Sequence, residues 1–189
     1  MDLYLHVKVL FGIIVGLSVT HLLRGVAHII QHPKKYRIYW VHLLWVFFLF
    51  LYLIHYWWWE FTLEKLHDWN FPLYFFVAFY AVLLYLLCAM LIPEQINEYE
   101  GFKDYFYSRR QWIFALMAVL FVADIVDTAI KGYSYYQRLG LAYDLRTGTF
   151  LLLSLLAIKI KRPAFHAVFA IFALAYEIVY ILEYYLTVR

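Results

Sequence analysis

The chain has 189 residues, of which 66% are hydrophobic and only 15% are charged, and its formal net charge is +3. A soluble domain of this size does not carry so large an apolar share, so the composition predicts a chain that lies in a membrane. No strongly basic face is present, so we do not expect nucleic acid as a partner. No phosphate-binding glycine loop, HExxH, CxxC or nucleophile-elbow motif occurs, and no loop is long enough for a substrate domain. We therefore do not expect an enzyme.

The first apolar segment, residues 5–30, is long enough to span a bilayer and carries two distinct faces. Gly12 and Gly16 form a pair of small residues four positions apart, which permits another helix to approach closely. We predict that these glycines line a helix–helix contact and that they support a homo-oligomer. A different side of the segment carries basic groups at spacings of three and four, which places them on one helix face: His21, Arg24 and His28.

The next two spans differ in polarity. A basic turn containing Pro33 separates the first span from the second, which is predicted at residues 38–59. His42 lies near the start of this second span and His55 near its end. The third span, residues 71–92, contains no charged residue, so we expect lipid to cover much of its surface.

A short amphipathic segment at residues 94–110 is predicted to lie on the membrane surface before the fourth span, residues 111–130. Asp124 and Asp127 share one face of that fourth span. Lys131 follows Asp127 by four residues, in the acid-before-base order that favours an ion pair on one helix.

The fifth span, residues 145–160, is the shortest, and the sixth, residues 164–187, carries His166, Glu177 and Glu183. The sequence thus predicts an all-α integral membrane protein whose six transmembrane helices form three hairpins. The whole chain, residues 1–189, is expected to be a single transmembrane domain.

The basic residues are distributed unevenly between the loops. Nine lysines and arginines fall in the first, third and fifth connections, against six on the opposite side of the membrane. Because positive loops face the cytoplasm, both termini are expected outside it, in a membrane like the bacterial inner membrane. The nine are Lys34, Lys35, Arg37, Lys103, Arg109, Arg110, Lys159, Lys161 and Arg162.

Ionisable side chains come mainly from spans one, two, four and six, which predicts a polar interior between those helices with spans three and five at the periphery. Asp124 and Glu177 lie a helical turn or more inside the outer boundary, where a lone carboxylate must be paired or protonated. We expect both in one polar cluster, with His21 as the next group inward. His42 and His166 lie close to an interface, where hydrogen-bonded structural histidines are common.

These positions favour a proton or cation pathway, because histidine and carboxyl groups at graded depths can pass protons between them. The residues assigned to this pathway are His21, Arg24, His28, His42, Asp124, Asp127 and Glu177. Arg24 alone has two further interpretations: it extends toward lipid headgroups, or it pairs with Glu94.

Two alternatives stay open. The first is a non-catalytic membrane scaffold or partner subunit, whose buried polar groups only specify helix packing. The second is a b-type haem protein, since an antiparallel hairpin of the first two spans would pair His6 with His55 and His21 with His42. A metal site from His55, Asp124, Asp127 and Glu177 is a variant of the pathway, although no HxxE or ExxH spacing supports it. Otherwise no cofactor is expected.

Overall fold

The computed structural model describes residues 3–66 and 69–187, and over these residues the chain is helical, without strands. The helices are α1 (Leu3–Gln31), α2 (Trp40–Trp59), the 3-10 helix η1 (Glu60–Lys65), α3 (Phe71–Leu91), α4 (Phe102–Lys131), α5 (Tyr133–Lys159) and α6 (Pro163–Thr187). Six of these helices are long and apolar enough to cross a membrane. The predicted all-helical, six-span class is therefore confirmed.

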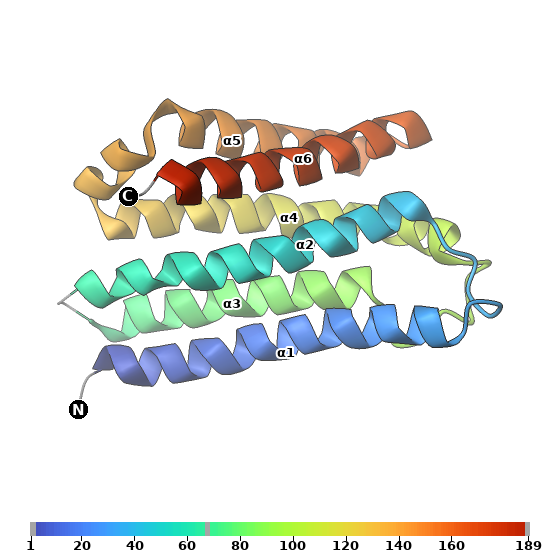
Figure 1. Ribbon diagram of the computed structural model, residues 1–189, viewed down its shortest axis with the longest axis horizontal. Coiled ribbons are helices and arrows are strands. Elements are labelled where there is room, and N and C mark those ends of the chain that lie inside the picture. The colour runs from blue at the N-terminus through green and yellow to red at the C-terminus, as the bar shows by residue number, and fades with distance from the viewer. Residues whose placement is uncertain (1–2, 67–68, 188–189) are drawn as a thin grey trace.

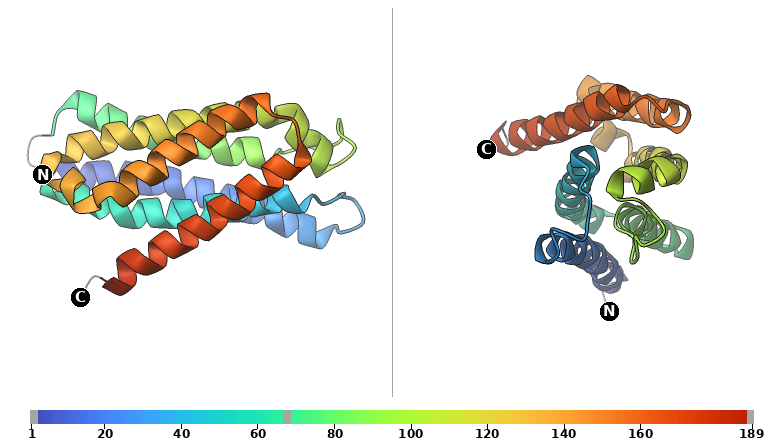
Figure 2. Two further views of the ribbon diagram at one scale, coloured as in Figure 1. Left: turned by 90° about the horizontal axis from the view of Figure 1, so that it is seen from above. Right: turned by 90° about the vertical axis from the view of Figure 1, so that its right-hand side faces the viewer.

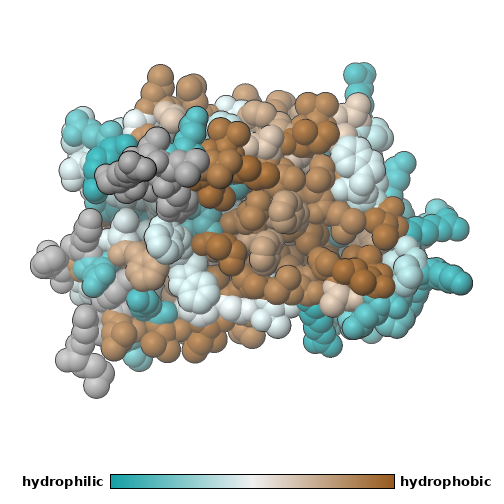
Figure 3. Space-filling model, viewed as in Figure 1, coloured by the Kyte–Doolittle hydropathy of each residue, from teal (hydrophilic) through white to brown (hydrophobic). Residues whose placement is uncertain are grey.

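The outer surface of the bundle suits a membrane. Large apolar side chains point outward in the middle of the helices, and Ile13, Leu17 and Phe75 are 56%, 55% and 60% exposed. Figure 3 shows apolar side chains over the middle of one face and hydrophilic side chains toward its two ends. Exposing such an apolar belt to water is unfavourable, whereas contact with lipid is favourable. The six apolar helices therefore indicate a membrane location.

The helices run side by side along the long axis of the molecule, and both termini lie at the same end (Figure 1). The most extensive contacts join α4 with α5, α1 with α3, and α2 with α6, whereas α5 and α6 touch each other little. Figure 2 shows the bundle from above and from one end. Among sequence neighbours, α4 packs extensively against both α5 and α3, whereas α1 with α2 and α5 with α6 touch less. The predicted arrangement of three hairpins is therefore not confirmed.

An aromatic layer fills the middle of the bundle between α2, α4, α5 and α6. The ring centroid of Trp45 lies 5.4 Å from that of Phe114 and 4.9 Å from that of Phe169. Phe48 stacks on Phe150 at 5.9 Å, and all five rings are at most 2% exposed. These edge-to-face and stacked rings form a closely packed, largely apolar layer.

Helices α4 and α5 differ most from expectation. Residues 102–110, predicted as part of a separate amphipathic segment, are the first turns of α4, so that segment is not confirmed. Helix α5 begins at Tyr133 rather than at residue 145, so it is not the shortest helix. It kinks at Gly140, whose φ of 62° and ψ of −168° lie in a region that only glycine adopts freely. Residues 132–144 were predicted to form a loop, because tyrosines and glycines there interrupt the apolar pattern.

The glycines of α1 do not act as predicted within one chain. A Cβ atom built on Gly12 or Gly16 would meet nothing within 4 Å, so neither glycine lines an intramolecular helix contact. The close approach occurs instead at Gly25, where a Cβ atom would collide with the side chain of Ile92 at the end of α3. Gly25 therefore sets the distance between α1 and α3, and a homo-oligomer through Gly12 and Gly16 stays a prediction.

Candidate functional site

A polar cluster lies inside the bundle at the end that carries the termini. It is formed by the last turns of α2, α4 and α6, together with η1 and the adjoining turns of α3 and α5. Its members are Tyr52, His55, Glu60, Tyr80, Asp124, Asp127, Lys131, Arg146 and Glu177. Because water is excluded from such an interior, each of these polar groups needs a protein partner or a bound one.

Glu177 is at the centre of one part of the polar cluster. The Nδ1 atom of His55 lies 2.7 Å from Glu177 Oε1, and the Nη2 atom of Arg146 lies 3.5 Å from Oε2. Glu177 is fully buried, and the side chains of His55 and Arg146 are 7% and 6% exposed. The guanidinium of Arg146 also lies 5.0 Å from the ring centroid of Tyr180 and 5.8 Å from that of Tyr52. A carboxylate and two aromatic faces therefore hold the arginine in the interior.

Lys131 is at the centre of the second part. Its Nζ atom donates to Asp127 Oδ2 at 2.6 Å and to Glu60 Oε1 at 2.8 Å. The predicted ion pair between Asp127 and Lys131 is therefore present, and η1 adds Glu60, which was assigned to a loop. These three side chains are between 2% and 5% exposed, so the interactions lie in a low-dielectric environment.

Asp124 lies between the two parts. Its Oδ1 atom accepts a hydrogen bond from the Tyr80 hydroxyl at 3.3 Å, and that hydroxyl lies 3.2 Å from the hydroxyl of Tyr52. Asp124 lines a cavity of about 30 Å³ together with His55 and Arg146, the two residues that bind Glu177. The structure thus brings Asp124 and Glu177 to one cluster. A cavity of that volume has room for roughly two water molecules.

Arg146 was not among the predicted site residues. Its place at the predicted start of the fifth span grouped it with the six basic residues on the outer side, and that span was expected at the periphery. Both assignments were wrong, because α5 starts earlier. A signal was present in the sequence: small and polar residues recur at helical spacing along one buried face of α5. This face comprises Tyr143, Arg146, Thr147, Phe150, Ser154 and Ala157.

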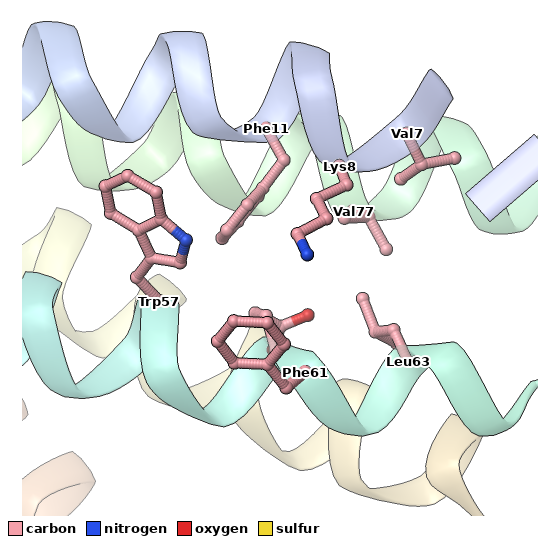
Figure 4. A pocket seen from close by; sticks show the side chains of 8 residues that line it. Val7, Lys8, Phe11, Trp57, Phe61, Leu63 and Val77 are labelled. Atoms are coloured by element: carbon pink, nitrogen blue, oxygen red, sulfur yellow. The ribbon is translucent and has the colours of Figure 1, made fainter. Parts of the chain in front are cut away.

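A second, smaller cavity of about 20 Å³ lies between α1, α3 and the end of α2 with η1 (Figure 4), and Glu60 is among the residues that line it. Apolar side chains including Phe11 and Leu63 line it. The ammonium group of Lys8 points into it and lies 4.6 Å from the ring centroid of Phe61. This cavity places a cation of α1 next to the carboxyl group of Glu60.

Polar groups at the opposite end of the bundle bind the ends of helices instead. At the end of α3, Nε2 of His42 lies 2.6 Å from the carbonyl oxygen of Leu91, and the Tyr105 hydroxyl donates to the carbonyl oxygen of Met90 at 2.7 Å.

The end of α5 is bonded in the same way. Arg110 donates to the carbonyl oxygen of Ala157 at 3.1 Å and to that of Ile158 at 3.0 Å. Nε2 of His166 lies 2.8 Å from the carbonyl oxygen of Ile160. The last carbonyls of a helix have no partner within it, so these side chains satisfy them. His42 and His166 thus bond helix-end carbonyls, and His42, which the sequence also assigned to the pathway, does not join the polar cluster.

His21 does not continue the polar cluster inward. Its Nε2 atom lies 2.8 Å from the carbonyl oxygen of Ile92, beyond the aromatic layer as seen from Glu177. The structure therefore does not place His21 next to the polar cluster, and its part in a proton pathway stays a prediction. Arg24 and His28 are exposed on the same face of α1, and they line a separate cavity with Glu94. Within residues 3–66 and 69–187, no ion pair joins Arg24 to Glu94.

The histidines predicted for haem have other surroundings. Nε2 of both His21 and His42 bonds a backbone carbonyl, Nδ1 of His55 bonds Glu177, and His6 is exposed on α1. In the part of the chain that the structure describes, no three histidine, cysteine, aspartate or glutamate side chains are arranged to hold a metal ion. The four-residue metal site considered from the sequence is therefore not formed.

Fold and site together define a helical membrane protein with a buried cluster of ionisable side chains at one end. No protein-family model matches the sequence, and neither a curated protein nor a solved structure matches it. Its function therefore has to be argued from the polar cluster itself.

Proposed function

We propose that this protein moves protons or small cations across the membrane, and that the polar cluster takes them up. The observation that carries the proposal is the balance of charge inside the bundle. The polar cluster contains four carboxyl groups, on Glu60, Asp124, Asp127 and Glu177, but its only arginine and lysine are Arg146 and Lys131. Lys8 lines a cavity with Glu60 and adds a third cation, so the fourth carboxylate is balanced only when His55 beside Glu177 carries a proton or when a further cation is bound.

An uncompensated charge in a membrane interior is costly, so the polar cluster must acquire a proton or a cation to balance it. Asp124 and the cavity beside it are the natural place for this uptake. Arg146 lines the same cavity and also binds Glu177, so one guanidinium can stabilise whichever carboxylate is left charged. The polar cluster thereby supplies an acceptor and a fixed counter-charge at one position.

The aromatic layer closes the way to the other membrane face in this conformation. Trp45, Phe114 and Phe169 pack against one another between the polar cluster and the helix-end carbonyls. Passage therefore requires the helices to rearrange, and the kink at Gly140 marks a segment of α5 that can move. Leu139, next to the kink, lines the cavity beside Asp124. Motion of this segment would open the cavity.

The test is flux into liposomes that contain a pH-sensitive dye. Wild type should dissipate an imposed proton or cation gradient faster than empty liposomes, whereas Asp124→Asn and Glu177→Gln should approach the empty-liposome rate. These amides keep the shape of the side chains but cannot exchange a proton. The matched control is Asp144→Asn, which makes the same change on the exposed face of α5, where Tyr136 binds the carboxylate. No flux by folded wild type, under either gradient direction and across pH, would contradict the proposal.

A scaffold or partner subunit is the second candidate. It is favoured by the end of the bundle opposite the termini (Figure 1), which carries the basic connections and is called the basic-loop end below. There, polar side chains such as Arg110 and His166 bond the last carbonyl oxygens of helices, which is a structural role. If the wild-type protein conducts nothing, while charge-removing variants of the polar cluster only lower the melting temperature, the scaffold should replace the transport proposal.

A further inference from the structure

A cavity of about 340 Å³ lies at the basic-loop end, between the second half of α1 and the connection from α3 to α4. Arg24, His28 and Glu94 are its charged or ionisable lining groups together with His21. Its other walls include apolar side chains, among them Ile29, Ile92, Ile96 and Phe102. The cavity therefore combines a basic side with an apolar floor, and the proposed transport does not use it.

The cavity exists because α3 ends early. Helix α3 stops at Leu91, whereas α1 continues to Gln31, so the extra turns of α1 face the loop that follows α3. The contact of Gly25 with Ile92 holds α1 against the end of α3 and fixes the floor. His21 bonds the carbonyl oxygen of Ile92, which removes that oxygen as a competing acceptor for the basic groups.

The basic side of the cavity has cations in excess. Arg24 is exposed and forms no salt bridge within the described ranges, and Glu94 is the only acidic residue in the lining. At the rim, the ammonium of Lys35 lies 5.6 Å from the ring centroid of Tyr36, which lines the cavity. Arg24 and Lys35 together outweigh Glu94, so an anion is favoured here.

The depth of Arg24 indicates which anion. Seven residues separate it from the end of α1, which corresponds to about 10 Å at 1.5 Å per residue. An arginine left at that depth facing hydrocarbon costs roughly 3 to over 10 kcal/mol, and an anionic partner lowers this cost. The phosphates of membrane lipids lie near this level, on the side where basic loops gather.

We infer that this cavity binds a phosphate group, held by Arg24 and His28, with the apolar floor against the remainder of the ligand. Arginine donates two parallel hydrogen bonds to phosphate, which explains why a guanidinium occupies the position. The phosphate comes either from the headgroup of an anionic phospholipid or from a dissolved phosphate ion.

The two sources are separated by placing the protein in nanodiscs. Wild type in phosphatidylcholine discs that contain some phosphatidylglycerol should retain the anionic lipid preferentially on native mass spectrometry. Arg24→Gln should weaken that retention by about tenfold or more, since a hydrogen bond to a charged group is lost. Lys161→Gln is the matched control, because Lys161 is an exposed cation at the same end but in the α5–α6 turn. It should retain the lipid as wild type does.

The second arm titrates inorganic phosphate against protein in pure phosphatidylcholine discs. A phosphate-dependent rise in melting temperature that Arg24→Gln abolishes, without preference for the anionic lipid, would support the site with dissolved phosphate as the source. Equal lipid retention and equal phosphate response in wild type and Arg24→Gln would overturn the inference. If Arg24→Gln fails to fold, Arg24→Lys takes its place, because it keeps the charge and loses only the two-point geometry.

Discussion

Arg146 of α5 and Glu177 of α6 place a guanidinium nitrogen and a carboxylate oxygen 3.5 Å apart inside the bundle, although the two helices otherwise touch each other little. His55 of α2 completes the contact from the other side of Glu177. One carboxylate thereby joins three helices that are distant in the sequence. This junction is therefore central both to the stability of the bundle and to the transport that we propose.

Removing either partner of this pair should destabilise the protein. Glu177→Gln leaves the buried guanidinium of Arg146 without its carboxylate, and Arg146→Gln leaves Glu177 with His55 alone. Removing one partner of a buried ion pair typically costs about 3–5 kcal/mol. The double variant Arg146→Gln with Glu177→Gln should recover part of the loss, because no unpaired charge remains. Thermal unfolding in one detergent measures all three, with exposed Arg138→Gln as the control. Additive losses in the double variant would show that the two residues are not coupled.

The kink of α5 gives a prediction about two glycines of one helix. Gly140→Ala should lower the unfolding free energy by about 1–3 kcal/mol, because its backbone angles are strained for any side chain. Gly148→Ala should leave stability unchanged or raise it by up to about 1 kcal/mol, since alanine favours the helix and nothing lies within 4 Å. Comparing the two melting temperatures tests the kink. An equal response of both variants would mean that α5 is straight at Gly140.

The glycines of α1 give another prediction. Gly25→Ala should destabilise by about 1–3 kcal/mol, because the added methyl group collides with Ile92. Combining it with Ile92→Ala should relieve the collision and give a smaller loss than the two single losses added together.

Gly16→Leu should leave the fold of one chain intact and alter only the oligomeric size in detergent, measured by light scattering. Unchanged size would remove Gly12 and Gly16 as an oligomer contact.

The orientation in the membrane is a prediction from the loops. The basic connections between α1 and α2, α3 and α4, and α5 and α6 lie at the end opposite the termini (Figure 1). The positive-inside rule then places the termini, and the polar cluster near them, outside the cytoplasm. Reporter enzymes fused to the C-terminus test this directly: a reporter active only outside the cytoplasm should work, and one active only inside should not. The reverse pattern would invert the proposed direction of uptake.

The sequence by itself determined the class of this protein. Apolar segments of spanning length can be read one helix at a time, because lipid requires each segment to be apolar and to satisfy its own backbone hydrogen bonds. The pair of Asp127 with Lys131 was equally readable, since both residues lie on one helix at a fixed spacing. Depth near an interface also favoured hydrogen-bonded histidines at positions 42 and 166, although His42 was assigned to the pathway as well.

Only the tertiary structure decided which helices meet. The pairing of α1 with α3 and of α2 with α6 depends on how whole helix faces fit, and side-chain periodicity within one helix does not specify a partner. The place of Arg146 could not be predicted for the same reason, because it depends on a kink at Gly140 and on Glu177 of another helix. The partner of His21 could not be predicted either, because helix position gives depth but not the neighbour, which proved to be the carbonyl oxygen of Ile92. The local sequence therefore determined where the helices form, and packing between segments that are distant in the sequence determined which residues meet in the polar cluster.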